Sequence, residues 1–221
     1  MSKTIKNEAH FPAAGPVQLA DPINRQRRNL LCALPWLPLA GSALAQQPSP
    51  VAVRKLHGFT IRVSDVSRSV AFYQDLFGAP VQARQGDSVY LRIGPGPRFF
   101  AIKPLAAGQS PGFDSIGLSV ADFDLIRTQN RLAAFGVEPG AVPAPGDDPL
   151  ASAMRSWVVE RRSAPGEGLT RELYFADIEG IRYQLMPEDY CGGGGEYGSS
   201  CSAPEAAPAA GRFDLVDLSH F

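Results

Sequence analysis

One pattern of hydrophobic and polar positions occurs twice along the chain, over residues 59–78 and again over residues 116–136. In the first copy Phe59, Ile61 and Val63 alternate with polar residues, which predicts a half-buried strand. A helix should follow, with Asp65 as its N-cap and Gly78 at its end. The residues expected to share its apolar face are Val66, Val70, Tyr73 and Leu76 or Phe77.

The second copy repeats these signals in the same order. A strand is predicted over residues 116–120, and a helix should follow with Asp122 as its N-cap and Gly136 at its end. Its expected apolar positions are Leu125, Leu132 and Phe135. Two unrelated strand–helix units are the alternative interpretation, but the shared order of signals favours a duplicated fold.

Three further strands are predicted after each helix. They cover residues 81–84, 88–93 and 98–103 in the first half, and 157–160, 169–175 and 181–186 in the second. A proline- and glycine-rich insertion at 138–149 should form a surface loop. The sequence thus predicts an α+β fold of two tandem βαβββ modules. Their expected bounds are 53–105 and 113–187, with a linker at 106–112 between them.

The first 45 residues have the composition of an export signal. A basic run that includes Arg27 and Arg28 precedes an apolar stretch at 30–40, and Ala43-Leu44-Ala45 offers a cleavage site before the linker at 46–52. The paired arginines resemble a twin-arginine signal, which implies a periplasmic or secreted protein. An uncleaved membrane anchor is the alternative, but the apolar stretch is shorter than the roughly 18 residues that a span needs. We expect no stable membrane insertion after cleavage.

The charge balance of the chain argues against nucleic acid as a partner. The chain carries 21 Lys and Arg against 22 Asp and Glu without a basic stripe, so nucleic-acid binding has little electrostatic support.

Cys191 and Cys201 flank the glycine-rich run 192–195, and in an oxidising compartment they should form a disulfide. This disulfide would close a loop within the segment 188–211. A two-thiolate metal site is the alternative, but no further Cys or His lies nearby.

Four short motifs stand at residues 62–65, 69–73, 76–78 and 172–180. Through these motifs, residues 56–186 resemble the vicinal-oxygen-chelate superfamily of glyoxalases, extradiol dioxygenases and bleomycin- and fosfomycin-resistance proteins. It implies paired modules whose sheets curl around a cavity, with the helices outside. Strand alternation then directs a set of mostly polar side chains inward, namely Thr60, Arg62, Tyr90, Arg92, Ser119, Arg182 and Gln184.

The resemblance also implies a divalent metal, which metal-using members hold with His in the first strand and Glu in the last strand of each module. Here the two His positions fall on Gly58 and Ser115, and the two Glu positions fall near Ala101 and on Gln184. His57 is one residue out of register, so it should be structural or exposed and point away from the cavity unless a bulge intervenes. We therefore expect no metal cofactor, although a divalent metal is not excluded.

These expectations lead to a first hypothesis, that the protein holds an anionic or oxygen-rich small molecule without a metal. The predicted ligand-binding residues are Thr60, Arg62, Tyr90, Arg92, Tyr174, Arg182 and Gln184. Glu172 could act as a general base if it is buried. The arginines could instead lie at strand ends in solvent.

An enzyme is the second hypothesis, a lyase, isomerase or dioxygenase with an atypical metal site or one completed by another chain in a homodimer. Residues 212–221 motivate it, because Asp217 to Phe221 resemble the opening of a further module and place His220 opposite Gly58. A structural or partner-binding protein, with a cavity filled by side chains, is the third hypothesis.

Overall fold

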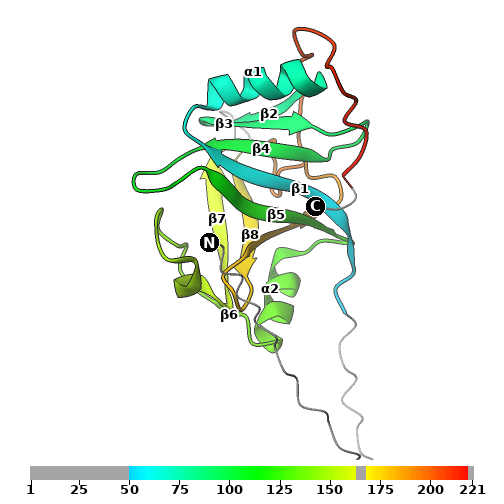
Figure 1. Ribbon diagram of the computed structural model, residues 1–221. Helices are drawn as coiled ribbons and strands as arrows, with labels where there is room; N and C mark the ends of the chain where they lie inside the picture. Colours follow the sequence, from blue (N-terminus) through cyan, green and yellow to red (C-terminus); the bar gives the residue numbers. More distant parts are fainter. Residues whose placement is uncertain (1–49, 163–167, 219–221) are drawn as a thin grey trace, which may run out of the picture. The chain divides into compact units, whose positions relative to one another are not determined.

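Figure 1 shows the computed structural model of the protein, which describes residues 50–162 and 168–218. The chain divides into two units, residues 1–46 and 47–221, and the described residues belong to the second. The predicted export signal at 1–45 lies outside the described residues and stays a prediction. Within the described part of the chain, no helix combines the length and the apolar character needed to cross a membrane.

The first module is built from β1 (Val53–Val63), α1 (Val66–Phe77), β2 (Val81–Gln85), β3 (Ser88–Arg92) and β4 (Phe99–Pro104). β1 pairs with β4 in parallel, and β3 pairs with both β4 and β2 in antiparallel orientation. The strands therefore lie in the order β2-β3-β4-β1.

The second module contains β5 (Gly112–Val120), α2 (Leu125–Ala134), β6 (Glu138–Pro139), β7 (Arg155–Arg162), β8 (Leu169–Ala176) and β9 (Arg182–Pro187). The order β5-β9-β8-β7 repeats that of the first module, and β5 again pairs with the last strand in parallel. The insertion at 138–149, predicted as a loop, begins with the short strand β6, and a 3₁₀ helix at Pro149–Ser152 starts at its last residue.

β1 and β5 pair in antiparallel orientation and join the modules into one curled sheet of nine strands among the described residues (Figure 1). The predicted α+β fold of two βαβββ modules is therefore confirmed. Alternation in β1 also behaves as expected, because Phe59, Ile61 and Val63 pack toward α1 in the core of the first module. The polar residues between them are thus directed to the opposite face of the sheet.

The first helix begins and ends where the sequence predicts. The Asp65 carboxylate accepts a hydrogen bond from the backbone N–H of Arg68 at 2.9 Å. Gly78 ends the helix with a φ of 62°, a left-handed conformation that glycine adopts without steric cost.

The predicted N-cap of the second helix is wrong. Asp124 caps α2 by accepting the backbone N–H of Arg127 at 2.6 Å, whereas Asp122 lies in the preceding turn with a φ of 46°. This turn needs a left-handed residue, which Asp tolerates better than most residues do. Phe135 is also not on the buried face: it follows the last helical residue and is 81% exposed.

His57 occupies a β-bulge in β1, which is the one case in which its ring was not expected to point away from the cavity. Leu56 pairs with Leu118 and Gly58 with Gly117, so His57 is an extra residue in the ladder. The bulge turns its ring to the concave face, where it contacts Phe99 edge-on and its Nε2 lies 2.7 Å from the carbonyl oxygen of Tyr190. His57 is fully buried, which excludes the exposed alternative and leaves the structural one.

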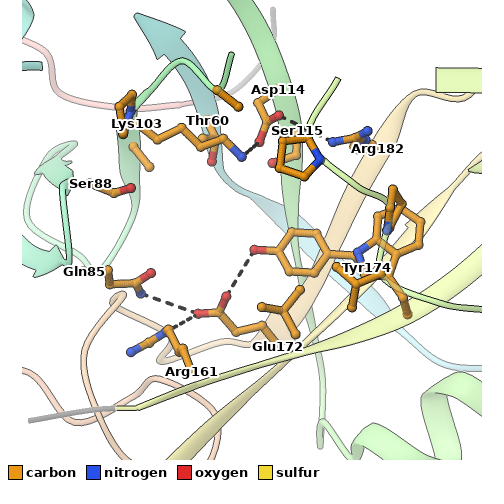
Figure 2. A pocket seen from close by; sticks show the side chains of 18 of the residues that line it. Thr60, Gln85, Ser88, Lys103, Asp114, Ser115, Arg161, Glu172, Tyr174 and Arg182 are labelled. Carbon is orange, nitrogen blue, oxygen red and sulfur yellow. Dashed lines mark hydrogen bonds and ion pairs between the residues drawn. The ribbon is translucent and has the colours of Figure 1, made fainter. Parts of the chain in front are cut away.

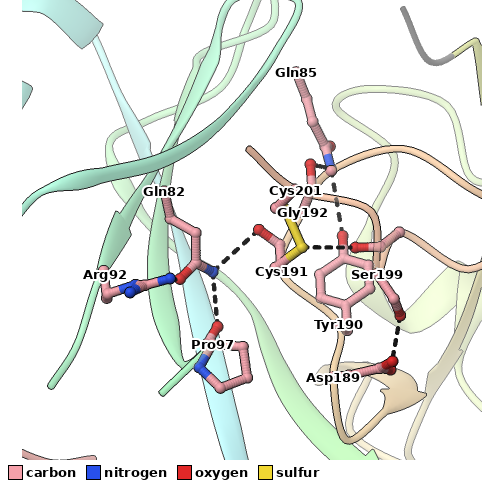
Figure 3. The surroundings of a disulfide bond; sticks show 12 residues. Gln82, Gln85, Arg92, Pro97, Asp189, Tyr190, Cys191, Gly192, Ser199 and Cys201 are labelled. Carbon is pink, nitrogen blue, oxygen red and sulfur yellow. Dashed lines mark hydrogen bonds between the residues drawn. A yellow bond between two sulfur atoms is a disulfide. The ribbon is translucent and has the colours of Figure 1, made fainter. Parts of the chain in front are cut away.

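The predicted disulfide between Cys191 and Cys201 is present (Figure 3). The loop that it closes supplies backbone carbonyls to side chains of the first module: Gln82 donates to Cys191 and Gln85 donates to Gly192. The loop is thereby attached to β2.

The chain after the loop returns to the first module. Glu205 and Val81 exchange two backbone hydrogen bonds of 2.8 Å along β2, and Leu215 and Leu218 pack against the core under α1. Residues 212–218 form no strand, and His220 lies outside the described residues, so the resemblance to a further module stays a prediction.

Candidate functional site

A cavity of about 360 Å³ lies between the two modules, on the concave face of the sheet (Figure 2). Part of its lining is one row of paired residues across four neighbouring strands: Tyr90 pairs with Ala101, Ala101 with Thr60, and Thr60 with Ser115. Residues 142–145 of the proline-rich insertion line the cavity from outside the sheet. Both modules and the insertion therefore contribute to the site.

Three cations surround Asp114 at one wall of this cavity. Its carboxylate lies 2.7 Å from Nη1 of Arg62, 2.5 Å from Nζ of Lys103 and 3.8 Å from Nη1 of Arg182. The Asp114 side chain is 7% exposed, so these charges are only partly screened by water. Within this group of four side chains, three positive charges meet one negative charge, which leaves an excess of two positive charges.

A β-bulge places Asp114 in the cavity. Thr60 pairs with Ser115, but Ile61 pairs with Phe113, so Asp114 is an extra residue in β5. For this reason the consecutive residues Asp114 and Ser115 both line the cavity, although simple alternation would direct them to opposite faces.

Glu172 is the centre of a second polar group on the opposite side of the cavity (Figure 2). Its Oε1 accepts hydrogen bonds from Nε of Arg161 and the hydroxyl of Tyr190, both at 2.8 Å, and its Oε2 accepts one from the hydroxyl of Tyr174 at 3.2 Å. Nε2 of Gln85 lies 3.5 Å from Oε1. Arg161 and Glu172 neutralise one another, so this group adds no net charge.

The tyrosines around Glu172 remain protonated far into the alkaline range. Burial is the main cause that raises the pKa of Tyr90 and of Tyr174 well above 10, and the nearby negative charge of Glu172 adds to it. Burial raises the pKa of Tyr190 as well. These hydroxyls therefore act as hydrogen-bond donors at neutral pH.

Aromatic rings form one apolar part of the lining. Trp157 and Tyr174 are paired across β7 and β8, and their rings stack with centroids 6.1 Å apart and planes 7° apart. Both residues line the cavity. A flat ligand could pack against this surface.

The structure divides the predicted ligand-binding residues into two sets. Thr60, Tyr90, Tyr174 and Arg182 line the cavity. Arg62 pairs with Asp114 without lining the cavity, Arg92 donates instead to Oε1 of Gln82 on the side of the disulfide loop (Figure 3), and Gln184 is buried without lining the cavity. Glu172, the predicted base, lines the cavity and is 5% exposed.

Sequence reasoning missed four prominent lining residues: Lys103, Asp114, Trp157 and Arg161. Lys103 could have been found, because it lies in a predicted strand on the same face as Phe99 and Ala101, at every second position. Arg161 was lost because the predicted strand ended at residue 160, whereas β7 continues to Arg162.

Residues 55–154 match the family model described as the Glyoxalase/Bleomycin resistance protein/Dioxygenase superfamily. This stretch of the chain is therefore similar to the domains of that superfamily. The match covers the first module and the beginning of the second. No curated protein matches the sequence.

Solved structures with a similar chain path include two dioxygenases and an epimerase. The 2,3-dioxygenase LapB from Pseudomonas sp. KL28 is 20% identical, with 71% of this chain and 46% of that chain covered and a TM-score of 0.42. Homoprotocatechuate 2,3-dioxygenase from Brevibacterium fuscum is 16% identical, with 64% and 40% covered and a TM-score of 0.42.

Methylmalonyl-CoA epimerase from Mycobacterium tuberculosis is also 16% identical, with 63% of this chain and 91% of that chain covered and a TM-score of 0.42. The chain spans less than half the length of the two dioxygenases.

The residues at the superfamily's metal positions do not fit a divalent metal. Gly58 and Ala101 have no side-chain donor, Ser115 offers a neutral hydroxyl, and Gln184 is a neutral amide that does not line the cavity. Among the described residues, no three His, Cys, Asp or Glu side chains gather as a metal site would require. The cations around Asp114 would also repel a divalent ion at that wall.

Proposed function

We propose that the cavity between the modules binds a small organic anion and that binding does not require the superfamily's metal. The excess of positive charge around Asp114 is the observation that carries this proposal. A partly buried excess of two positive charges is costly unless an anion or water compensates it. An anionic ligand would supply that compensation.

Lys103 and Arg182 are the cations best placed to contact such a ligand, because both line the cavity and Arg62 does not. Their side chains are 36% and 19% exposed, so they keep access to solvent and to an incoming molecule. Ser115 and Thr60 add hydroxyl groups on the same side of the sheet. We assign Glu172 to hydrogen bonding with the ligand rather than to proton transfer, since Arg161 and two tyrosines already bind its carboxylate.

Calorimetric titration of the full chain with benzoate and with benzamide, both in EDTA, tests this proposal. Benzoate should bind, and benzamide, which has the same shape without the charge, should bind at least tenfold more weakly, because a hydrogen bond to a charged group contributes about 1.5–3 kcal/mol. Lys103→Met and Arg182→Met should each weaken benzoate binding, whereas Lys55→Met on an exposed part of β1 should not. Equal affinities for benzoate and benzamide would contradict the proposal, as would benzoate binding that EDTA abolishes and Fe²⁺ or Zn²⁺ restores.

We also propose that the protein is exported. The basic and apolar pattern at residues 25–45 supports this, and so does the disulfide, because disulfides persist mainly in oxidising compartments. Replacing Arg27 and Arg28 with lysine should retain the protein in the cytoplasm if the twin-arginine route is used. Unchanged distribution in cell fractions would argue against that route.

A further inference from the structure

We propose that the ligand is a hydroxy-carboxylate: its carboxylate contacts Lys103 and Arg182, and its hydroxyl group donates a hydrogen bond to Oε2 of Glu172. This inference rests on the proposed function, because it names the chemical class of the anion in the same cavity. The two polar groups involved lie on opposite sides of the open space in Figure 2. A molecule that occupies the cavity would lie between them.

The Glu172 carboxylate has an acceptor position that no described residue fills. A carboxylate offers about four lone-pair positions, two on each oxygen. Oε1 is fully used by Arg161 and Tyr190, with Gln85 at a longer distance, whereas Oε2 receives only the Tyr174 hydroxyl. Because the side chain is 4% exposed, the second position on Oε2 is served by whatever molecule occupies the cavity.

The molecule that fills this position has to be a donor. The Tyr174 hydroxyl already donates to Oε2, and the Gln85 amide nitrogen donates on the Oε1 side. If the incoming group were an acceptor, neither it nor Oε2 would gain a hydrogen bond, and its partial negative charge would be repelled by the carboxylate. A hydroxyl group meets the requirement and adds no charge of its own.

The opposite wall has the reverse requirement. Arg182 makes an ion pair to Asp114 at 3.8 Å, which is too long for a hydrogen bond, and its guanidinium makes no hydrogen bond within the described residues. Lys103 has three N–H donors and uses one of them on Asp114. These unused donors match the two oxygens of a carboxylate.

The space between the two walls favours a flat and compact body. At about 360 Å³ the cavity is at the small end of the usual range for ligand sites. Trp157 and Tyr174 present stacked rings along it, and Val142 and Pro143 line it from the insertion. An aromatic ring that carries both substituents would pack against these surfaces.

Matched ligands test the hydroxyl contact separately from the charge. Titration of the full chain with benzoate, 3- and 4-hydroxybenzoate, 4-methoxybenzoate and phenol should give the tightest binding for one of the two hydroxybenzoates. We expect it to exceed benzoate by about tenfold, as a hydrogen bond to a charged acceptor implies. The methoxy compound, which cannot donate, should not exceed benzoate.

Glu172→Gln should abolish the preference for hydroxybenzoate while benzoate binding persists, and Glu138→Gln on the exposed strand β6 is the matched control. If Glu172→Gln fails to fold, the ligand series on the unmodified protein still decides the question. Equal binding of benzoate and both hydroxybenzoates would overturn this inference and leave the proposed anion site intact. Binding of phenol as tight as that of the hydroxybenzoates, or no binding of any of the acids, would overturn both.

Discussion

Replacing Asp114 with asparagine should lower the stability of the protein and raise its affinity for anions. The carboxylate is 7% exposed and lies 2.5 Å and 2.7 Å from two cations. Removing one partner from a fully buried ion pair costs about 3–5 kcal/mol. Because asparagine keeps an oxygen for Arg62, and Lys103 can regain water at 36% exposure, we expect a loss of about 2–3 kcal/mol in the free energy of unfolding.

The same change removes the negative charge of Asp114 from its group of three cations, so the excess within this group rises from two positive charges to three. A unit charge about 5 Å from a bound carboxylate contributes roughly 3 kcal/mol at an effective dielectric constant of about 20. Solvent access at Lys103 and Arg182 reduces this to about 1–2 kcal/mol, which is roughly five- to thirtyfold tighter binding of benzoate.

Urea unfolding and calorimetric titration with benzoate measure the two effects on one preparation. Asp214→Asn is the matched control, because Asp214 is exposed and makes no hydrogen bond or ion pair with another described residue. It should change neither quantity by more than about 0.5 kcal/mol. If Asp114→Asn loses stability and benzoate affinity together, Asp114 organises the ligand contacts instead of opposing an anion, and the charge argument is refuted.

Three further predictions follow from other parts of the site. Burial lowers the pKa of His57 below 6.5, so the unfolded chain binds more protons as the pH falls through 6.5; unfolding in urea should show stability falling from pH 7 to pH 5, and less steeply in His57→Gln. The raised pKa of Tyr90 and of Tyr174 acts at the other end of the pH range: the unfolded chain loses these protons first, so stability should fall as the pH rises through about 10. Phenolate absorbance should show that these tyrosines ionise only on unfolding, and Tyr90→Phe should lose less stability over this range. Replacing Cys191 and Cys201 with serine should lower the free energy of unfolding by about 3 kcal/mol on the chain-entropy model. It should also weaken benzoate binding, because Gln85 and Arg161 donate to carbonyls of the closed loop; an unchanged affinity for benzoate would show that the loop does not support the site.

The fold could be predicted because its signals are local. The alternation at Phe59, Ile61 and Val63, the cap at Asp65 and the end at Gly78 each depend on a few neighbouring residues. The repetition of this order in the second half, together with the superfamily resemblance, then fixed the module type. The predicted N-cap of α2 was wrong because Asp122 and Asp124 stand two residues apart, and only the backbone conformation of the turn decides which of them caps the helix.

The residues of the site were harder to predict, because two β-bulges and a strand longer than predicted determine which side chains face the cavity. Alternation assigns one face to every second residue, and a single extra residue reverses the assignment beyond it. His57 and Asp114 are both such extra residues, so neither could be placed from its position in the pattern. The assignment of Arg161 to the site depended on where β7 ends, and that end is set by pairing with β8 and not by the local sequence.

The two ends of the sheet resist joining a strand from another molecule. β2, the strand at one end, is occupied by Glu205, which uses both backbone groups of Val81, while the Arg84 side chain binds the Glu205 carboxylate. At the other end, β6 has two residues and one of them is proline, which cannot donate to a neighbour. A strand approaching from outside would have to displace Glu205 from Val81 at β2, and at β6 it would meet a strand of only two residues. Such edges protect a sheet-rich protein against aggregation at high concentration.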